Sequence, residues 1–237
     1  MWAFCLHSLF REYGWQFFWR MAVPHPLKTA KAVFGSGALD FSGDVTALLP
    51  AGCGTGFGGA GSIVGLGFCL KPMNPPCPSG RANHDCAFLE KLLDSEARDI
   101  PEACRRCAIR EIGLLTLRTG AAFYIMTSAR DILLDVYAPA RDEIKFSTGL
   151  FALCRYSLRP FAVGLLASGM GGWLFAFEKG DCRDYKTWLQ ADRGIKKERT
   201  EINAPNQQAI RILLGEIARK PRPAAHFEKR GNILYPR

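Results

Sequence analysis

Four cysteines in the first half of the chain have the residue type and the spacing of a metal centre. Two of them lie in Cys77-x8-Cys86, and two form the tight pair Cys104-x2-Cys107. Thiolates are soft, anionic donors for iron and zinc, and a C-x2-C pair can place both sulfurs on one ion or one cluster. The spacing therefore predicts that these four cysteines bind a metal centre.

The spacing favours an iron–sulfur cluster over a zinc ion. Structural zinc sites usually combine two tight C-x2-4-C pairs, whereas iron–sulfur clusters take four cysteines at irregular spacings. The sequence contains only one tight pair. We therefore expect a [4Fe-4S] cluster, with zinc as the alternative cofactor. Replacement ligands are also present, the first choices being Cys69 and Cys182, and the full set is Cys53, Cys69, Cys154 and Cys182.

Basic side chains and one histidine accompany these cysteines in the sequence. The basic residues could offset the charge of four thiolates, and they are Lys71, Arg81, Arg105 and Arg106. His84 lies between Cys77 and Cys86, and an imidazole can transfer a proton near neutral pH. We expect His84 to hydrogen-bond around the centre rather than to ligate it, because metal sites need such outer partners.

Three apolar runs in the second half predict buried strands over residues 122–126, 149–154 and 172–177. Each run is followed by a predicted helix, and open α/β sheets bind ligands beyond the carboxyl ends of their strands. The loops at these ends contain arginines and side chains that carry protons or act as nucleophiles. We expect an anionic substrate to bind Arg130, Arg155 and Arg183, and the catalytic candidates are His84, Ser128, Asp181 and Cys182.

The alternation of strands and helices predicts an α/β fold. We expect a layered sheet with helices, at least partly parallel, preceded by a Cys/Gly/Pro-rich cluster-binding segment. The expected organisation is an N-terminal extension over 1–34, a Cys-rich metal-cluster-binding region over 35–120, an α/β region over 121–219 and a basic tail over 220–237.

Capping and proline signals predict where the helices begin and end. One helix is expected over 103–118, after Pro101, which suits a first helical position. A second is expected over 129–138, ended by Pro139. Asp181 is expected to cap the helix that follows it.

The composition is that of a folded, water-soluble chain. Its 237 residues are 48% hydrophobic and its mean hydropathy is −0.01, which argues against extensive disorder and a multi-span membrane protein. No secretory signal is evident, so the nine cysteines are expected in the reducing cytoplasm. The aromatic segment 1–20 is expected to dock on the domain or to precede a natural start at Met21, with peripheral membrane contact as the alternative.

The net charge of +9 raises the question of nucleic-acid binding. The basic residues are dispersed and no aromatic RNA-binding signature occurs, so the sequence argues against this class of partner. The segment 54–59 matches G-x-G-x-x-G but lacks the strand, helix and acidic residue of a dinucleotide site. The expected partners are a small anionic molecule or a redox partner protein.

Together these features predict an iron–sulfur enzyme that acts on a small anionic substrate. If all four cysteines bind, electron transfer is the natural role, as in an oxidoreductase. If one ligand is missing, the open iron provides Lewis-acid chemistry, such as elimination or desulfuration by a lyase. The alternative is a noncatalytic protein, either a zinc-stabilised module or an iron–sulfur electron carrier or sensor with a basic partner-binding surface.

Overall fold

A mixed sheet of seven strands forms the centre of the computed structural model, which describes residues 13–48, 57–91, 100–143, 145–218 and 226–237. The strand order is β1-β5-β4-β2-β3-β7-β6. The strands are β1 (Val45–Leu48), β2 (Ser62–Gly67), β3 (Ala122–Met126), β4 (Thr148–Leu153), β5 (Gly171–Ala176), β6 (Phe227–Arg230) and β7 (Ile233–Pro236). Strands β5, β4, β2 and β3 are parallel neighbours, and antiparallel strands close both edges. The predicted α/β fold with a partly parallel sheet is confirmed.

The parallel strands are apolar because both faces of the sheet are covered. Every residue of β2, β3 and β4 is buried, as expected for continuous hydrophobic runs in a parallel sheet. Two glycines make room for one large side chain at the centre. A Cβ atom at Gly65 or at Gly149 would overlap the ring of Phe151.

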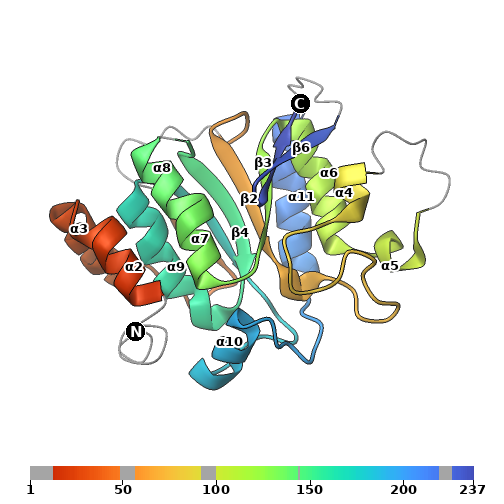
Figure 1. Ribbon diagram of the computed structural model, residues 1–237, viewed down its shortest axis with the longest axis horizontal. Helices are drawn as coiled ribbons and strands as arrows, with labels where there is room; N and C mark the ends of the chain where they lie inside the picture. Colours follow the sequence, from red (N-terminus) through yellow and green to blue (C-terminus); the bar gives the residue numbers. More distant parts are fainter. Residues whose placement is uncertain (1–12, 49–56, 92–99, 144, 219–225) are drawn as a thin grey trace.

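Helices lie on both sides of the sheet (Figure 1). One group contains α4 (Ala87–Lys91), α6 (Ala108–Thr119) and α11 (Ala204–Ala218), and α6 packs on α11. The other contains α3 (Pro26–Gly37), α7 (Ala129–Ile132), η4 (Leu133–Tyr137), α8 (Ala138–Asp142) and α9 (Arg155–Ser168), and α3 packs on α9. The remaining helices are α2 (Trp15–Phe17), η2 (Phe18–Ala22), η3 (Phe68–Leu70), α5 (Glu102–Arg105) and α10 (Tyr185–Asp192).

The strand order reverses direction between β2 and β4. The chain leaves β2 through α6 and enters β3 on one side, whereas it leaves β4 through α9 and enters β5 on the other side. Such a switch point separates the two connections and opens a crevice at the carboxyl ends of the two strands. The segments that begin at this crevice are η3 after β2 and α9 after β4.

The helix expected over 103–118 is interrupted. It consists of α5 and α6, and the backbone leaves the helical conformation at Arg106 (φ −116°, ψ 32°) and Cys107 (φ −91°, ψ 117°). No glycine or proline marks this break in the sequence. Gly120, with φ of 73°, ends α6 as expected, since a left-handed residue favours glycine.

Two other helix boundaries differ from the expected ones. Asp184, not Asp181, caps α10, because its carboxylate accepts a hydrogen bond from Thr187 N at 2.8 Å in a capping box. Pro139 does not end its helix, which continues through α8 to Asp142. The wider π-helical turn η4 precedes this proline, and such turns accommodate residues that do not fit regular α-helical hydrogen bonding.

The chain end joins the sheet instead of forming a loose basic tail. Strands β6 and β7 form a hairpin, and β7 pairs with β3. Phe227, Ile233 and Leu234 are buried in this arrangement. The apolar residues therefore outweigh the prolines and basic residues that suggested a tail.

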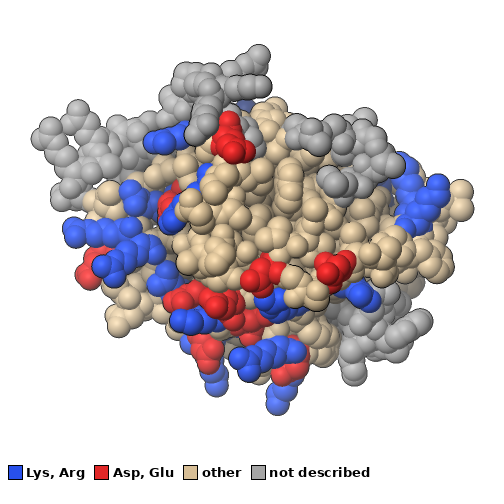
Figure 2. All heavy atoms as spheres, turned by 180° about the vertical axis from the view of Figure 1, so that it is seen from behind, with Lys and Arg blue, Asp and Glu red and all other residues tan. Residues whose placement is uncertain are grey.

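The surface carries both charge and exposed aromatic groups. Figure 2 shows acidic and basic side chains interleaved along the lower edge of one face, below a broad area without charges. Trp15, Phe18 and Trp19 are about half exposed, while residues 1–12 of the aromatic segment lie outside the described part. Among the helices of the described ranges, none is long and apolar enough to cross a bilayer.

Candidate functional site

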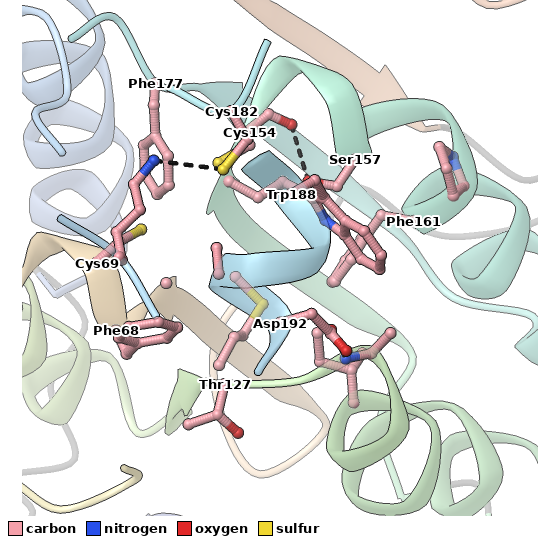
Figure 3. Close-up of a pocket in the computed structure, with 18 of the residues that line it drawn as sticks. Phe68, Cys69, Thr127, Cys154, Ser157, Phe161, Phe177, Cys182, Trp188 and Asp192 are labelled. Carbon is pink, nitrogen blue, oxygen red and sulfur yellow. Dashed lines mark hydrogen bonds between the residues drawn. The ribbon is translucent and has the colours of Figure 1, made fainter. Parts of the chain in front are cut away.

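A pocket lies at the carboxyl ends of the parallel strands, where the strand order reverses (Figure 3). It encloses about 90 Å³. Its walls are largely apolar and include Phe68, Phe161, Phe177 and Trp188. The polar and sulfur-containing lining residues are Cys69, Thr127, Cys154, Ser157, Cys182, Asp192 and Lys196.

Three cysteines reach this pocket from three neighbouring strands. Cys69 follows β2, Cys154 follows β4 directly, and Cys182 follows β5 in a loop. The side chain of Cys154 interacts with both of the others, lowering the pKa of each. Figure 3 shows the sulfur atoms of Cys154 and Cys182 together, with Cys69 beside them. The order of the strands thus brings together thiols that are far apart in the sequence.

Lys196 provides a positive charge at these thiols. Its Nζ donates a hydrogen bond to Cys182 Sγ at 3.3 Å. The backbone carbonyl of Lys196 accepts a hydrogen bond from the guanidinium of Arg81, which also donates to the carbonyls of Glu198 and Cys69. Arg81 therefore fixes the segment that carries the lysine next to η3, the short helix that contains Cys69.

The neighbouring groups lower the pKa of two of the three thiols, Cys182 and Cys69, and raise the pKa of Cys154. The hydrogen bond from Cys154 and the charge of Lys196 lower the pKa of Cys182 to about 7, although burial and Asp181 oppose this shift. The pKa of Cys154 lies well above its usual value because of its hydrogen bonds to Cys182 and Cys69 and its burial. The pKa of Cys69 is lowered as well, chiefly by Cys154. Cys154 therefore keeps its proton, while Cys182 and Cys69 are the more acidic thiols, and Cys182 is the one in direct contact with Lys196.

The contact with Cys182 also stabilises the positive charge of Lys196. Burial, the largest single effect, disfavours the ammonium. The charge and hydrogen bond of Cys182, together with the charges of Cys154 and Cys69, outweigh it, so the pKa of Lys196 is raised. Among the described residues that line the pocket, the charged side chains are Lys196 and Asp192. The carboxylate of Asp192 accepts a hydrogen bond from Ala129 N at 2.7 Å, which ties α10 to the start of α7.

His84 lies in a hydrogen-bond network beside the pocket. Its Nδ1 lies 2.8 Å from Ile125 O and its Nε2 lies 3.0 Å from the hydroxyl of Thr127, which lines the pocket. Both Thr127 and Ser128 donate to the carboxylate of Asp131, at 2.6 and 2.8 Å. Ser128 also caps α7 through Asp131 N. The structure thus brings two catalytic candidates, His84 and Ser128, into one network.

The three candidate arginines point elsewhere. Arg130, Arg155 and Arg183 are exposed, and none of them lines the pocket. Arg155 forms an ion pair with Asp44. The basic side chain that does line the pocket is Lys196, which the sequence analysis did not single out.

Asp181 has a structural contact in place of its expected capping role. Both carboxylate oxygens accept a hydrogen bond from Arg155 N at 3.2 Å, at the start of α9. Burial raises the pKa of this carboxyl group, although hydrogen bonds from Cys154 and Arg155 N oppose the shift. Asp181 therefore lies next to the thiols through Cys154.

The four cysteines of the predicted metal centre lie in the irregular segment between β2 and α6. Cys86, Cys104 and Cys107 are buried and Cys77 is partly buried. Burial, followed by the negative charge of neighbouring cysteines of this set, raises the pKa of Cys86 to about 12 and also raises that of Cys104. In the described ranges, no three His, Cys, Asp or Glu side chains form a group that would hold one metal ion, and Cys53 lies outside those ranges.

A buried lysine lies among these cysteines. Lys71 is 1% exposed, and its Nζ donates to Gly80 O at 3.1 Å, to Asn83 O at 2.9 Å and to Asn83 Oδ1 at 2.5 Å. Burial lowers its pKa, and the charges of Cys77, Cys86, Asp85 and Cys107 oppose this shift. The ammonium therefore lies close to three of the four predicted ligands.

The comparisons with known proteins leave the site to be interpreted from its own residues. No protein-family model, no curated protein and no solved structure matches this chain. Two sulfur-containing regions can be interpreted chemically. We call Cys77, Cys86, Cys104 and Cys107 with Lys71 the four-cysteine region, and Cys69, Cys154 and Cys182 with Lys196 the thiol pocket.

Proposed function

We propose that this chain is an iron–sulfur oxidoreductase, in which the four-cysteine region holds a [4Fe-4S] cluster and a small anionic molecule binds in the thiol pocket. The observation that carries this proposal is the position of Lys71. Its ammonium is buried, and the oxygens that accept its hydrogen bonds are uncharged. A buried charge is unfavourable unless an opposite charge compensates it. Asp85 supplies part of that charge but is paired with Lys229, and a thiolate-bound cluster would supply more.

The donor set of the region fits such a cluster. The imidazole of His84 is engaged with Ile125 O and Thr127, so the cysteines are left as the donors, and an all-thiolate set is typical of iron–sulfur clusters. Cys107 lies at the N-terminal end of α6, where the helix dipole favours an anionic sulfur. The break between α5 and α6 separates Cys104 and Cys107 into two short segments that can adjust to a ligand.

When bound through four cysteines, such a cluster supplies one-electron transfer. The chain's own residues would bind and orient the substrate. Lys196 attracts an anion, Thr127 and Ser157 offer hydroxyl groups, and the aromatic walls exclude water. Cys69 precedes Lys71 by two positions, so the thiol pocket and the four-cysteine region adjoin in the chain.

Metal and acid-labile sulfide analysis of protein purified without oxygen tests this proposal. We expect about four Fe and four sulfide per chain, with a broad absorption band near 400 nm that bleaches on reduction. A parallel sample purified in air serves as the control and should lose sulfide and colour together. One zinc per chain and no sulfide would contradict the proposal and leave a zinc-stabilised module. A colourless, metal-free and folded protein would contradict both metal assignments.

A further inference from the structure

We propose that Cys182 and Cys154 form a two-electron thiol–disulfide centre that reduces a small disulfide entering the thiol pocket. Figure 3 shows the sulfur atoms of Cys182 and Cys154 together. Lys196 Nζ lies 3.3 Å from Cys182 Sγ. The inference rests on the thiol pocket alone and does not use the four-cysteine region. It therefore goes beyond the proposed electron-transfer role.

The surroundings give the two thiols different roles. Four titratable groups face Cys182, and they are Cys154, Lys196, Asp181 and Cys69. Their combined effect leaves the pKa of Cys182 at about 7, close to the value at which an attacking thiol is most effective near neutral pH. Cys154 retains its proton, and its sulfur is in contact with Cys182. The pKa of Cys69 is also lowered, but Lys196 Nζ donates directly to Cys182 Sγ. This contact makes Cys182 the attacking group and leaves Cys154 as the resolving group.

The reaction balances in atoms and electrons. The thiolate of Cys182 attacks one sulfur of a disulfide RS–SR′, so a Cys182–SR bond forms and R′S⁻ leaves. Cys154 then gives up its proton and attacks the sulfur of Cys182, forming the Cys154–Cys182 disulfide and releasing RS⁻, which takes that proton. The substrate gains two electrons and the two cysteines lose them. An external dithiol regenerates the pair by the reverse exchange.

The pocket limits the substrate to small molecules. Cys182 is 1% exposed, so a reagent must enter the cavity of about 90 Å³ to reach it. One water-sized position needs about 10–15 Å³ of such volume, so the cavity holds roughly six to nine of them. A dialkyl disulfide of a few carbons matches this size and the apolar walls, whereas a peptide or protein disulfide does not.

The test uses the reduced full-length protein and 2-hydroxyethyl disulfide, with glutathione disulfide as the bulky control. We expect the small reagent to oxidise the protein by two electrons, with peptide mapping that finds Cys154 linked to Cys182. We also expect glutathione disulfide to react at least tenfold more slowly. A disulfide formed by another pair of cysteines, no reaction at pH 8, or equal rates for the two reagents would overturn the proposal.

The Cys154→Ser variant and a metal-free preparation test whether Cys182 is the attacking group and whether the reaction needs a metal. In Cys154→Ser the mixed disulfide on Cys182 should accumulate, because the resolving thiol is absent. If the reagent instead accumulates on Cys69, Cys182 is not the attacking group and the proposal is wrong. The reaction should persist in protein from which metal has been removed, so the absence of a cluster would contradict the proposed function and leave this inference standing.

Discussion

Lys71 and Lys196 both lie beside cysteines, but their direct partners differ. Lys71 donates to uncharged backbone and amide oxygens and lies near Cys86 and Cys107, whose pKa values are raised. Lys196 donates directly to the sulfur of Cys182, a thiol with a lowered pKa. The first lysine therefore lies beside thiols that stay neutral, and the second lies in an ion pair that the protein forms by itself.

This difference separates a ligand-binding region from a reactive one. Neutral, buried thiols become anionic when a metal replaces their protons, so the four-cysteine region is suited to be completed by a metal centre. A thiolate that already exists near neutral pH is a nucleophile. Cysteine and lysine thus serve metal binding in one region and nucleophilic reaction in the other. The contact that each lysine makes distinguishes the two.

The largest expected effect is the loss of iron from the four-cysteine region. Cys107→Ser removes a predicted ligand, and we expect most of the bound iron and sulfide to be lost. Cys182→Ser is the matched control, since it changes a buried cysteine of the thiol pocket, and it should retain the iron. Metal and sulfide analysis of both variants, purified without oxygen, distinguishes the two regions. Equal iron content in the two variants would contradict their separation.

The next effect concerns the charge of Lys71. In metal-free protein, Lys71→Met removes a buried ammonium, and the loss of this unfavourable buried charge stabilises the fold. This gain offsets the roughly 1–3 kcal/mol lost when the acceptor carbonyls of Lys71 become unpaired. We therefore expect the free energy of unfolding of metal-free protein to stay the same or to rise by about 1–2 kcal/mol. The metal-loaded variant should be less stable than the metal-loaded parent, because the cluster loses its counter-charge.

Urea denaturation of the parent and of Lys71→Met, each with and without metal, measures this change in the sign of the stability difference. Lys28→Met provides the control, since Lys28 is an exposed lysine on α3, and it should have little effect in either state. A loss of stability of the same size with and without metal would show that Lys71 serves packing alone.

The sequence predicts the parallel strands of the core well, because the residue patterns that mark these strands are local. The strand expected over 122–126 has the bounds of β3, and those expected over 149–154 and 172–177 are displaced by one residue from β4 and β5. Each is a run of apolar residues next to a glycine or a helix start. The interruption at Arg106 and Cys107 has no such signal, because no breaker residue occurs there.

The site is predicted only in part, because it depends on which strands are neighbours. Cys182 and the carboxyl edge of the sheet follow from strand and helix alternation. The pairing of β2 with β4 and of β4 with β5 brings Cys69, Cys154 and Cys182 together, and no local pattern specifies that order. Lys196 lies in a charged stretch after α10, where nothing in the sequence separates it from its solvent-exposed neighbour Lys197.

A smaller effect is expected on the ionisation of Cys182. The rate at which iodoacetamide alkylates this residue should rise with an inflection near pH 7. Lys196→Met removes a positive charge that favours the thiolate, so the pKa should move upward, toward the ordinary value of 9.0, by roughly one unit, or about 1.4 kcal/mol. Lys197→Met, the neighbouring exposed lysine, should leave the inflection unchanged.

Peptide mass spectrometry across a pH series follows this alkylation at each cysteine. In the same metal-free sample Cys86 should remain unmodified at pH 7, since its pKa is raised to about 12. If Cys182 and Cys86 were alkylated with the same pH dependence, the two lysines would not differ in their effect on the neighbouring thiols.

The smallest effect is expected for Arg155, which is the first residue of α9 and does not line the thiol pocket. Its ion pair with Asp44 joins side chains that are 44% and 41% exposed. Solvent screens such a pair, so Arg155→Ala should lower the free energy of unfolding by about 0–1 kcal/mol. The hydrogen bond to Asp181 comes from the backbone N–H of residue 155 and is retained in the variant. Thermal unfolding with Asp44→Ala as the partner variant completes a double-mutant cycle. A coupling well above 1 kcal/mol would mean that this surface contact stabilises the edge of the thiol pocket. The contrast between the exposed Arg155 and the partly buried Lys196 would then be smaller than the structure indicates.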